Sequence, residues 1–345
     1  MTLASPAIPQ LLQLPRQPLV AFIERHYEGA LHMVQSHPLA GGLQATGVFR
    51  VQAQLRGTTG RLWSVQFVAK LVQAEECREL AMYRALQANA AEALAPRLLG
   101  AEHLDTSSLL FLEWIRPVQR WPWRDTHTAS RVLERLAQLH QWSWGSELAM
   151  GIPWDYDEAL QQSGYETIEA FRRMVLAWGA TQWRGAVPLL QRLLEALPEM
   201  RRELLSATPQ VWIHGDVHPG NVVMRGSKAD SEPVLLDWAR ARLGSPLEDV
   251  SSWVQSLGHW EPQARRYHDT LVRQYLAARG LEPLLGHTFR RLYWIAGACN
   301  ALAGALRYHL VTAQQACTPH ARTAALNLVQ RWLRLLRCAD THWRA

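Results

Sequence analysis

The 345-residue sequence predicts an α+β protein, with strands concentrated in its N-terminal third and a larger, mostly helical remainder. Two observations carry this prediction. Apolar and alternating segments typical of strands are concentrated between residues 48 and 115, with glycine and proline between them. Beyond residue 117, apolar residues recur at helical spacing over most of the chain. We therefore expect three parts: an N-terminal arm and helix over residues 1–36, a strand-rich part over 37–115 and a helical part over 116–345.

Composition is typical of a soluble globular enzyme, with 48% hydrophobic and 19% charged residues. The formal net charge of +6 fits binding of a polyanion, and without a long run of lysine and arginine, dedicated nucleic-acid binding is not expected. The four cysteines lack metal-site spacing and are interpreted as free thiols of a reducing compartment. No signal peptide is recognised, and the most apolar stretch, residues 292–306, is too short to span a bilayer. We expect a cytoplasmic protein without membrane contact.

The N-terminal part is predicted to begin with a helix and to continue as a sheet. Residues 17–35 carry a helical apolar pattern, which the segment 38–42 ends with proline and glycine. Lys70 lies inside a predicted strand, where an unpaired charge is costly, so an acidic partner is expected nearby. The strands of this part are expected at residues 48–53, 62–71, 96–100 and 109–115.

Helices are expected to dominate the C-terminal part. Pro198 is a candidate break in one of them, and Gly297 or Gly304 in another. His140, at the end of the first, is interpreted as a core histidine whose ring nitrogens have partners. The predicted helices cover residues 128–142, 165–178, 188–205, 246–257, 262–278, 283–310 and 319–337.

One stretch of the C-terminal part concentrates polar residues between short strands. The apolar residues 211–213 lead into the loop HGDVHPGN (214–221), and a second apolar strand delivers Asp237. Asp216, Asn221 and Asp237 thereby reproduce the D-x-x-x-x-N…D layout of a kinase catalytic loop and its metal-binding aspartate.

Phosphoryl transfer explains these residue types. The reaction needs a base on the acceptor hydroxyl and Mg²⁺ ions that bridge the phosphates. Asp216 would take or orient the hydroxyl proton, while Asn221 and Asp237 offer the oxygen ligands that Mg²⁺ prefers. The alternative is that both aspartates merely form turns. His214 is expected to fix the loop by hydrogen bonding, and Asp249 to cap a helix or brace the loop.

Three signatures of this stretch resemble the aminoglycoside phosphotransferase and choline kinase family of small-molecule kinases. They are the loop 214–221, the triplet LDW at 236–238 and G-x-P-x-x-D at 244–249, in the family's order. The resemblance covers roughly residues 37–310 and implies a two-lobed protein-kinase-like fold, with a small antiparallel-sheet N-lobe over residues 37–115 and a mostly helical C-lobe over 116–345. It also implies ATP or GTP as donor, with Mg²⁺. Only eleven residues separate Asp237 from the last aspartate of the third signature (249 − 237 − 1 = 11), too few for the activation segment of a protein kinase. The acceptor is therefore expected to be a small molecule.

The resemblance also implies residues that hold the nucleotide. Lys70 would contact the α- and β-phosphates while a glutamate of the next helix, predicted over 74–86, pairs with it. We choose Glu79, because the pattern R-E-x-x-x-Y around it resembles the family's helix. Glu75 and Glu76 lie in the first turn, where acidic residues favour the helix dipole, and they remain the fallback.

Two further segments are candidate nucleotide contacts. Gly41, Gly42 and Gly47 would bring backbone N–H groups close to phosphates. Their order departs from that of the protein-kinase glycine loop, and a plain hairpin loop is an equal alternative. Glu113 to Ile115 would form the crossing between the lobes, whose backbone groups bind adenine in the family. The alternative there is a plain core strand.

Charge favours one class of acceptor. Polycationic aminoglycosides need a carboxylate-rich pocket, but roughly the last hundred residues are poor in Asp and Glu and rich in Arg. A neutral or partly apolar alcohol is therefore favoured. Candidates for the acceptor pocket are the acidic residues Asp155, Asp157 and Glu158 and the aromatic residues Trp154, Trp238, Trp253 and Trp260.

Two other functional classes stay open. A metal-dependent phosphoesterase could use Asp216, His218 and Asn221 as ligands, but it needs an upstream Asp-x-His after a strand. The upstream triplet at residues 125–127 does not follow an apolar strand. A non-catalytic nucleotide-binding module would be expected to lack one of the four kinase residues, and all four are present.

Overall fold

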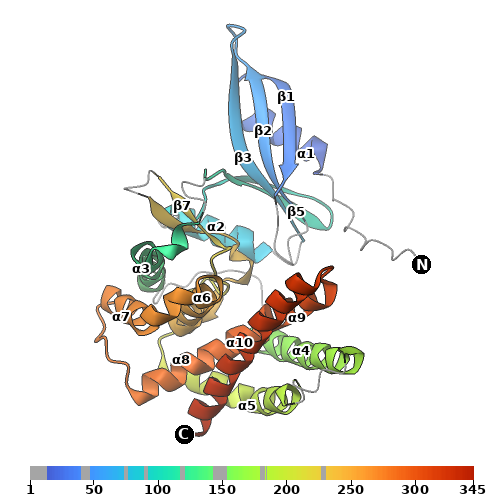
Figure 1. Ribbon diagram of the computed structural model, residues 1–345. Coiled ribbons are helices and arrows are strands. Elements are labelled where there is room, and N and C mark those ends of the chain that lie inside the picture. The colour runs from blue at the N-terminus through green and yellow to red at the C-terminus, as the bar shows by residue number, and fades with distance from the viewer. Residues whose placement is uncertain are drawn as a thin grey trace, which may run out of the picture. The chain divides into compact units, whose positions relative to one another are not determined.

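The computed structural model divides into two compact units (Figure 1). Unit 1 comprises Met1–Val118 and Val234–Ala239, and unit 2 comprises Gln119–Pro233 and Arg240–Ala345. A short segment from the middle of the chain therefore belongs to the N-terminal unit. The structure describes residues 14–39, 47–73, 77–88, 92–116, 121–142, 154–178, 183, 185–226 and 231–345.

Unit 1 is built on an antiparallel sheet with the strand order β1-β2-β3-β5-β4. In its register, Lys70 of the central strand β3 lies between Val48 of β2 and Leu110 of β5. The strands predicted from the sequence are all present, each with slightly different ends. The bounds are β1 (Ala30–Pro38), β2 (Gly47–Arg56), β3 (Leu62–Gln73), β4 (Leu98–His103) and β5 (Ser107–Glu113).

Alternation along β3 separates the two faces of this sheet. Phe67 and Ala69 belong to an apolar core that also contains Phe22 of helix α1 (Arg16–His26). The Phe22 ring stacks on Phe111 of β5 with 3.7 Å between the ring centroids. Because side chains alternate between the faces of a strand, Lys70 points away from this core. It pairs instead with helix α2 (Cys77–Ala88).

The helix predicted over residues 17–35 is wrong beyond His26. The chain leaves α1 there, turns through Gly29 at a φ of 102° and continues as β1. Leu31, which matched the helical pattern, is half-buried between the exposed neighbours Ala30 and His32, as in a strand. Pairing with β2 satisfies the backbone of this segment, an interaction that a local pattern does not reveal.

Unit 2 is mostly helical, as predicted. Its largest core is formed by helices that pack side by side in Figure 1, among them α4, α5, α8 and α10. None of the helices in the described part of the chain has the length and apolar character that a membrane crossing requires. The helices are α3 (Thr126–Trp142), α4 (Tyr156–Trp178), α5 (Ala186–Ala207), α6 (Pro246–Trp260), α7 (His268–Ala278), α8 (His287–Asn300), α9 (Leu306–Gln315) and α10 (Pro319–Arg344).

The ends of these helices differ from the prediction at several places. Helix α4 begins at Tyr156, well before the predicted start near Tyr165, and α5 continues through Pro198 without a break. The break in the long C-terminal pattern is confirmed at Gly304, which has a φ of 141° inside a π-turn (η7, Ala301–Ala305) between α8 and α9. Residues 262–278, predicted as one helix, form a 3₁₀ segment (η6, Pro262–Tyr267) followed by α7.

Short strands position the polar stretch of unit 2. Strand β6 (Val211–Ile213) was expected, and it pairs antiparallel with β9 (Arg242–Gly244), which was not. Strand β7 (Val222–Arg225) follows the polar loop, and the chain passes from unit 2 into unit 1 within β8 (Glu232–Leu235). The α+β architecture, with an N-terminal antiparallel sheet and a mostly helical remainder, is confirmed.

Candidate active site

In unit 1, Lys70 lies between two carboxylates. Its Nζ is 2.6 Å from Oε2 of Glu79 in α2 and 2.9 Å from Oδ1 of Asp237. The Lys70 and Glu79 side chains are buried, whereas the Asp237 side chain is 38% exposed. The structure therefore brings together three of the residues selected from the sequence. The fallback residues Glu75 and Glu76 lie outside the described residues.

Burial and the neighbouring charges shift the pKa values of Lys70 and Glu79 in opposite directions. Burial acts to lower the pKa of Lys70, but the carboxylates of Glu79 and Asp237 outweigh it and raise that pKa. Burial also raises the pKa of Glu79, and the ammonium group of Lys70 opposes this rise. Lys70 is thus held as a cation, and its charge compensates the carboxylate buried beside it.

Asp237 has an unusual backbone. Its φ of 63° is the one positive value at a non-glycine residue among the described residues. Such a conformation costs about 1–3 kcal/mol and persists only where the surroundings fix it. The next residue, Trp238, is fully buried, and its indole Nε1 donates to the carbonyl of Leu235 at 3.0 Å. The buried indole and the ion pair to Lys70 fix the direction of the Asp237 carboxylate.

In unit 2, Asp249 braces the loop 214–221. Its carboxylate accepts the backbone N–H groups of His214 and Gly215, each at 2.8 Å, and lies 3.1 Å from Nε2 of His140. The other ring nitrogen of His140 is 2.8 Å from the hydroxyl of Tyr275. The sequence left helix capping and loop bracing open for Asp249, and the structure shows bracing. His140 is the buried histidine with partners that was predicted.

The pKa shifts of this pair follow from burial and hydrogen bonding. Burial acts to raise the pKa of Asp249, but the hydrogen bonds and charges around the carboxylate lower it overall. Burial lowers the pKa of His140, with Asp249 opposing. An ionised Asp249 is thereby retained in the interior, where it holds two backbone N–H groups of the loop.

The backbone at Gly215 admits no side chain. Its φ is 80°, and a Cβ atom there would overlap the guanidinium of Arg242 and the carbonyl oxygen of Arg240. The loop therefore passes against β9 at this point. His214 fixes the next residue, since the backbone N–H of Asp216 donates to its Nδ1 at 3.2 Å. The structural role predicted for His214 is confirmed.

The same loop brings Asp216 and Asn221 together. The side-chain Nδ2 of Asn221 donates to the backbone carbonyl of Asp216 at 3.0 Å, so the amide oxygen is not used in this bond. The backbone N–H of Asn221 donates to the carbonyl of His218 at 2.8 Å. Both Asp216 and Asn221 are half-buried, and their side chains are held on one small, internally bonded loop.

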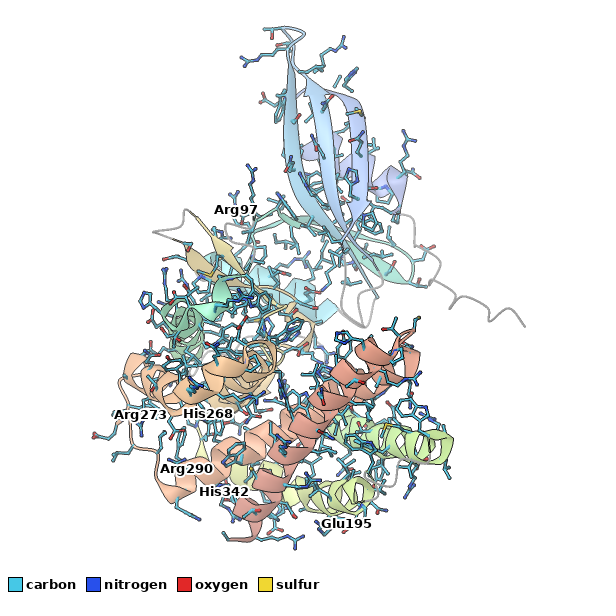
Figure 2. All side chains as sticks on the ribbon, viewed as in Figure 1. Arg97, Glu195, His268, Arg273, Arg290 and His342 are labelled. Atoms are coloured by element: carbon cyan, nitrogen blue, oxygen red, sulfur yellow. The ribbon has the colours of Figure 1, made fainter. Side chains whose placement is uncertain are left out.

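Of the predicted nucleotide contacts in unit 1, Gly47 and Glu113 lie at the ends of strands. Gly47 is the first residue of β2, while Gly41 and Gly42 lie outside the described residues. Glu113 ends β5, and its backbone N–H donates to the carbonyl of Arg97 at 2.9 Å (Arg97 is labelled in Figure 2). Ile115 follows and is buried.

The acceptor candidates separate into buried and exposed residues. Trp238 and Trp253 are fully buried and serve the cores of their units, whereas Trp260 is 57% exposed. Asp157 forms an ion pair with Arg201 at 2.7 Å, and Asp155 accepts a backbone N–H at the start of α4. The candidate carboxylates are thus partly committed to structural contacts.

Sequence reasoning missed a buried ionic network beside the loop. Glu248 pairs with Arg242 and, at 3.0 Å, with Arg201, while the Arg242 guanidinium lies 3.4 Å from the centroid of the Tyr156 ring. In the sequence, the one indication of this network was Glu248, which lies inside the motif G-x-P-x-x-D. Its partner Arg242 could not be placed beside it because strand β9 was not predicted. The network packs the guanidinium of Arg242 against Gly215 and so supports the loop from behind.

The chain is similar to known small-molecule kinases in sequence pattern and in fold. Residues 38–293 match the phosphotransferase enzyme family. The fold is similar to that of a choline kinase from Cryptosporidium parvum Iowa II (12% identity, 94% of this chain and 96% of that chain, TM-score 0.59). An aminoglycoside phosphotransferase from Alicyclobacillus acidocaldarius is similar over 99% of both chains (16% identity, TM-score 0.53). An ethanolamine kinase from Plasmodium vivax is similar over 87% of this chain and 81% of that chain (10% identity, TM-score 0.56).

These comparisons test the expectations drawn from the sequence. A search of curated proteins finds no match. The solved structures confirm the protein-kinase-like fold. No group of three or more His, Cys, Asp and Glu side chains that could hold a metal occurs among the described residues. The family match covers most of the chain and confirms the resemblance seen in the polar stretch. The chain belongs to the phosphotransferase enzyme family.

Proposed function

We propose that the protein transfers the γ-phosphate of ATP or GTP to a hydroxyl group of a small molecule. The observation that carries the proposal is the cluster in unit 1, where a buried lysine is held by Glu79 and by Asp237. A kinase needs such a cation at the α- and β-phosphates and such a carboxylate at the metal. In this proposal Lys70 contacts the phosphates, and Glu79 holds Lys70 in position.

The donor set fits Mg²⁺. Asp237 offers a partly exposed carboxylate, and Asn221 offers an amide oxygen because its Nδ2 is bonded to the loop backbone. Oxygen ligands of this kind, few in number and completed by water and phosphate, suit Mg²⁺. Bound Mg²⁺ would bridge the phosphates and neutralise the charge that develops on them during transfer. Asn221 and Asp237 are the residues proposed to hold it.

Asp216 is proposed as the catalytic base. Its carboxylate is half-buried on a loop that is fixed by Asp249 and by Asn221, so it can receive or orient a hydroxyl proton with little rearrangement. Gly41, Gly42 and Gly47 remain proposed contacts for the phosphates. The backbone of Glu113 to Ile115 remains the proposed adenine contact.

We favour an acceptor that is not a polycation. The acidic side chains Asp157 and Glu248 of unit 2 are paired with arginines and do not form an open carboxylate pocket. A neutral or partly apolar alcohol therefore stays the proposed acceptor. A nucleotide donor and the free thiols at Cys299, Cys317 and Cys338 support an enzyme that works in the cytoplasm.

Transfer of labelled γ-phosphate tests the proposal. Mg-ATP and Mg-GTP are offered with a panel of hydroxylated antibiotics, amino alcohols, polyols and sugars, and Asp216→Asn serves as the control. We expect a labelled product whose formation falls by a factor of about 10³ or more in Asp216→Asn, with nucleotide affinity unchanged. Wild-type turnover by Asp216→Asn would contradict the assignment of the base. A protein that binds neither nucleotide would contradict the function itself.

A further inference from the structure

Arg240 is a half-buried cation of unit 2 to which the proposed function gives no role. Its Nη2 donates to the backbone carbonyl of Ala303 at 2.8 Å, in the π-turn η7. No carboxylate among the described residues forms an ion pair with this guanidinium. The side chain is therefore held in place, while its positive charge stays available to a ligand.

The helical hydrogen-bond pattern is interrupted at the turn that holds this arginine. The backbone N–H of Leu306 donates to the carbonyl of Ala301, five residues earlier, instead of the carbonyl four residues earlier. Side chains bind the two carbonyls that follow. The hydroxyl of Ser163 donates to the carbonyl of Leu302 at 2.7 Å, and Arg240 donates to the next one. Single π-turns inside helices are frequent at functional sites, so this turn directs attention to the side chain it holds.

Gly304 makes the turn possible and leaves space beside the guanidinium. Its φ of 141° is a conformation that glycine adopts readily and other residues do not. Among the described residues, a Cβ atom at this position would have only Nη2 of Arg240 within 4 Å, at 3.8 Å. The space next to the guanidinium is therefore open on the side of Gly304.

The backbone of Arg240 lies against the loop 214–221. Its carbonyl oxygen would be 2.4 Å from a Cβ atom at Gly215, the residue before the proposed base Asp216. Arg242 also reaches Gly215, but its guanidinium is buried and paired with Glu248. Of these two arginines beside the loop, Arg240 is the one that is partly exposed and has no carboxylate partner among the described residues.

The helices on either side of η7 contribute no negative charge. Between Glu282 and Asp340 the chain contains neither Asp nor Glu, and this stretch includes α8, η7, α9 and most of α10. The carboxylate of Asp249 is buried and holds the backbone of the loop. An anion bound at Arg240 would therefore not be repelled by a carboxylate of these helices.

We propose that Arg240 is a further catalytic residue, which binds the phosphoryl group as this group passes from the nucleotide to the acceptor. This role rests on the proposed function. In that reaction the bond between the γ-phosphorus and the β,γ-bridging oxygen breaks, and a bond to the acceptor oxygen forms. The hydroxyl proton passes to Asp216, and the nucleoside diphosphate leaves with the electron pair of the broken bond.

The transfer brings negative charge to the loop 214–221. The oxygens of the phosphoryl group approach the acceptor hydroxyl, which is held by the carboxylate of Asp216. A fixed cation beside the loop compensates this charge without rearrangement during the reaction. A guanidinium suits the role because two of its N–H groups can bind two oxygens of one phosphoryl group.

The test uses the full-length protein and a mimic of the phosphoryl group in transfer, so the acceptor need not be known. Calorimetric titration compares the affinity for Mg-ADP and Mg-GDP with and without aluminium fluoride. We expect aluminium fluoride to tighten binding of the diphosphate by the wild-type protein about tenfold or more. Arg240→Gln should lose this tightening while its affinity for the diphosphate by itself is unchanged. Arg240→Lys, which keeps the charge without the planar fork, should retain part of the tightening.

Two control variants separate the charge of Arg240 from the structure around it. Ser163→Ala removes the other side-chain contact to η7 without a change of charge. Arg331→Gln removes a guanidinium that is also half-buried and also donates to one carbonyl, that of His259 at 3.2 Å. Both variants should show the tightening of the wild-type protein.

Three results would overturn the role of Arg240. They are full tightening in Arg240→Gln, loss of tightening in Ser163→Ala, and diphosphate binding by the wild-type protein that aluminium fluoride does not tighten. The second would show that the effect comes from the turn η7 rather than from the guanidinium. A wild-type protein that binds neither Mg-ADP nor Mg-GDP would instead contradict the proposed function, and this role with it.

Discussion

Lys70 is the residue whose charge makes the burial of Glu79 tolerable. A buried carboxylate without a partner is costly, and removal of one member of a buried pair costs about 3–5 kcal/mol. The contact between Nζ and Glu79 is 2.6 Å and nearly free of solvent. The lysine is therefore expected to contribute both to the stability of unit 1 and to the proposed position of the phosphates, and the two contributions can be separated.

Lys70→Ala should lower both stability and nucleotide use. We expect the free energy of unfolding to fall by about 3 kcal/mol because Glu79 loses its cation. The kcat/KM for Mg-nucleotide should fall by about 100-fold or more. Urea unfolding and steady-state kinetics measure the two effects. Lys70→Met/Glu79→Leu should recover most of the stability but none of the kcat/KM, and recovery of both would contradict the phosphate role.

Asp249→Asn is the corresponding test in unit 2. The asparagine keeps one oxygen but turns an NH₂ group toward a backbone N–H that needs an acceptor. We expect the free energy of unfolding to fall by about 1.5–3 kcal/mol, the range for a lost hydrogen bond to a charged group. Turnover should fall as well, because the loop carries the proposed base Asp216. Full turnover in this variant would show that the brace is not needed for the loop.

Much of the site could be predicted at this scale because chemistry restricts the residue types. A lysine inside a strand requires an acidic partner, and Glu79 is that partner. The second partner, Asp237, could not be foreseen as a contact of Lys70. Its carboxylate is directed by a positive φ and by the packing of Trp238, neither of which leaves a local sequence signal.

At the scale of elements, the success of prediction depends on whether an element is stable locally. Helix α3 and strand β3 carry strong patterns of their own and were recognised. Strand β9 has the sequence Arg-Leu-Gly and exists because β6 pairs with it, so no local pattern marks it. The same reason explains β1, whose alternation is weak and whose backbone is satisfied by β2.

The break at Gly304 allows a test of backbone conformation. Its φ of 141° is unfavourable for any residue with a Cβ, yet a Cβ there would have only the Arg240 side chain near it, at 3.8 Å. Gly304→Ala should therefore cost about 1–3 kcal/mol through the backbone alone. Gly286→Ala, at the N-cap of α8 and with open space, is the matched control and should change stability by less than about 1 kcal/mol. Equal effects of the two changes on urea unfolding would contradict this account.

For the whole molecule, two half-buried histidines predict a loss of stability in acid. Burial, with the nearby His309, Arg331 and Arg265, lowers the pKa of His259 to about 3. Burial likewise lowers the pKa of His309 to about 4. The unfolded chain takes up these protons near a pKa of about 6.5, whereas the folded chain does not. The stabilisation is present above pH 6.5 or so and declines as the pH falls toward the folded values.

Unfolding in urea between pH 7 and pH 4.5 measures this loss. The free energy of unfolding should fall by at most about 1.4 kcal/mol per pH unit for each histidine. His259→Gln/His309→Gln should show a shallower pH dependence than the wild-type protein. An unchanged slope in the double variant would assign the acid sensitivity to other groups. Asp249 and the other carboxylates with a lowered pKa add their loss at lower pH.

The segment Val234–Ala239 belongs to unit 1, although residues of unit 2 flank it on both sides in the sequence. Because the chain returns to unit 1 for this short segment, recombination between genes of such enzymes is restricted. A single crossover near residue 118 would import a new Lys70 and Glu79 but keep the recipient's Asp237. The lysine and its second carboxylate would then come from different ancestors. We therefore expect the two units to be inherited together, with substitutions around Lys70 and Asp237 accumulating in concert rather than by exchange of an intact N-terminal module.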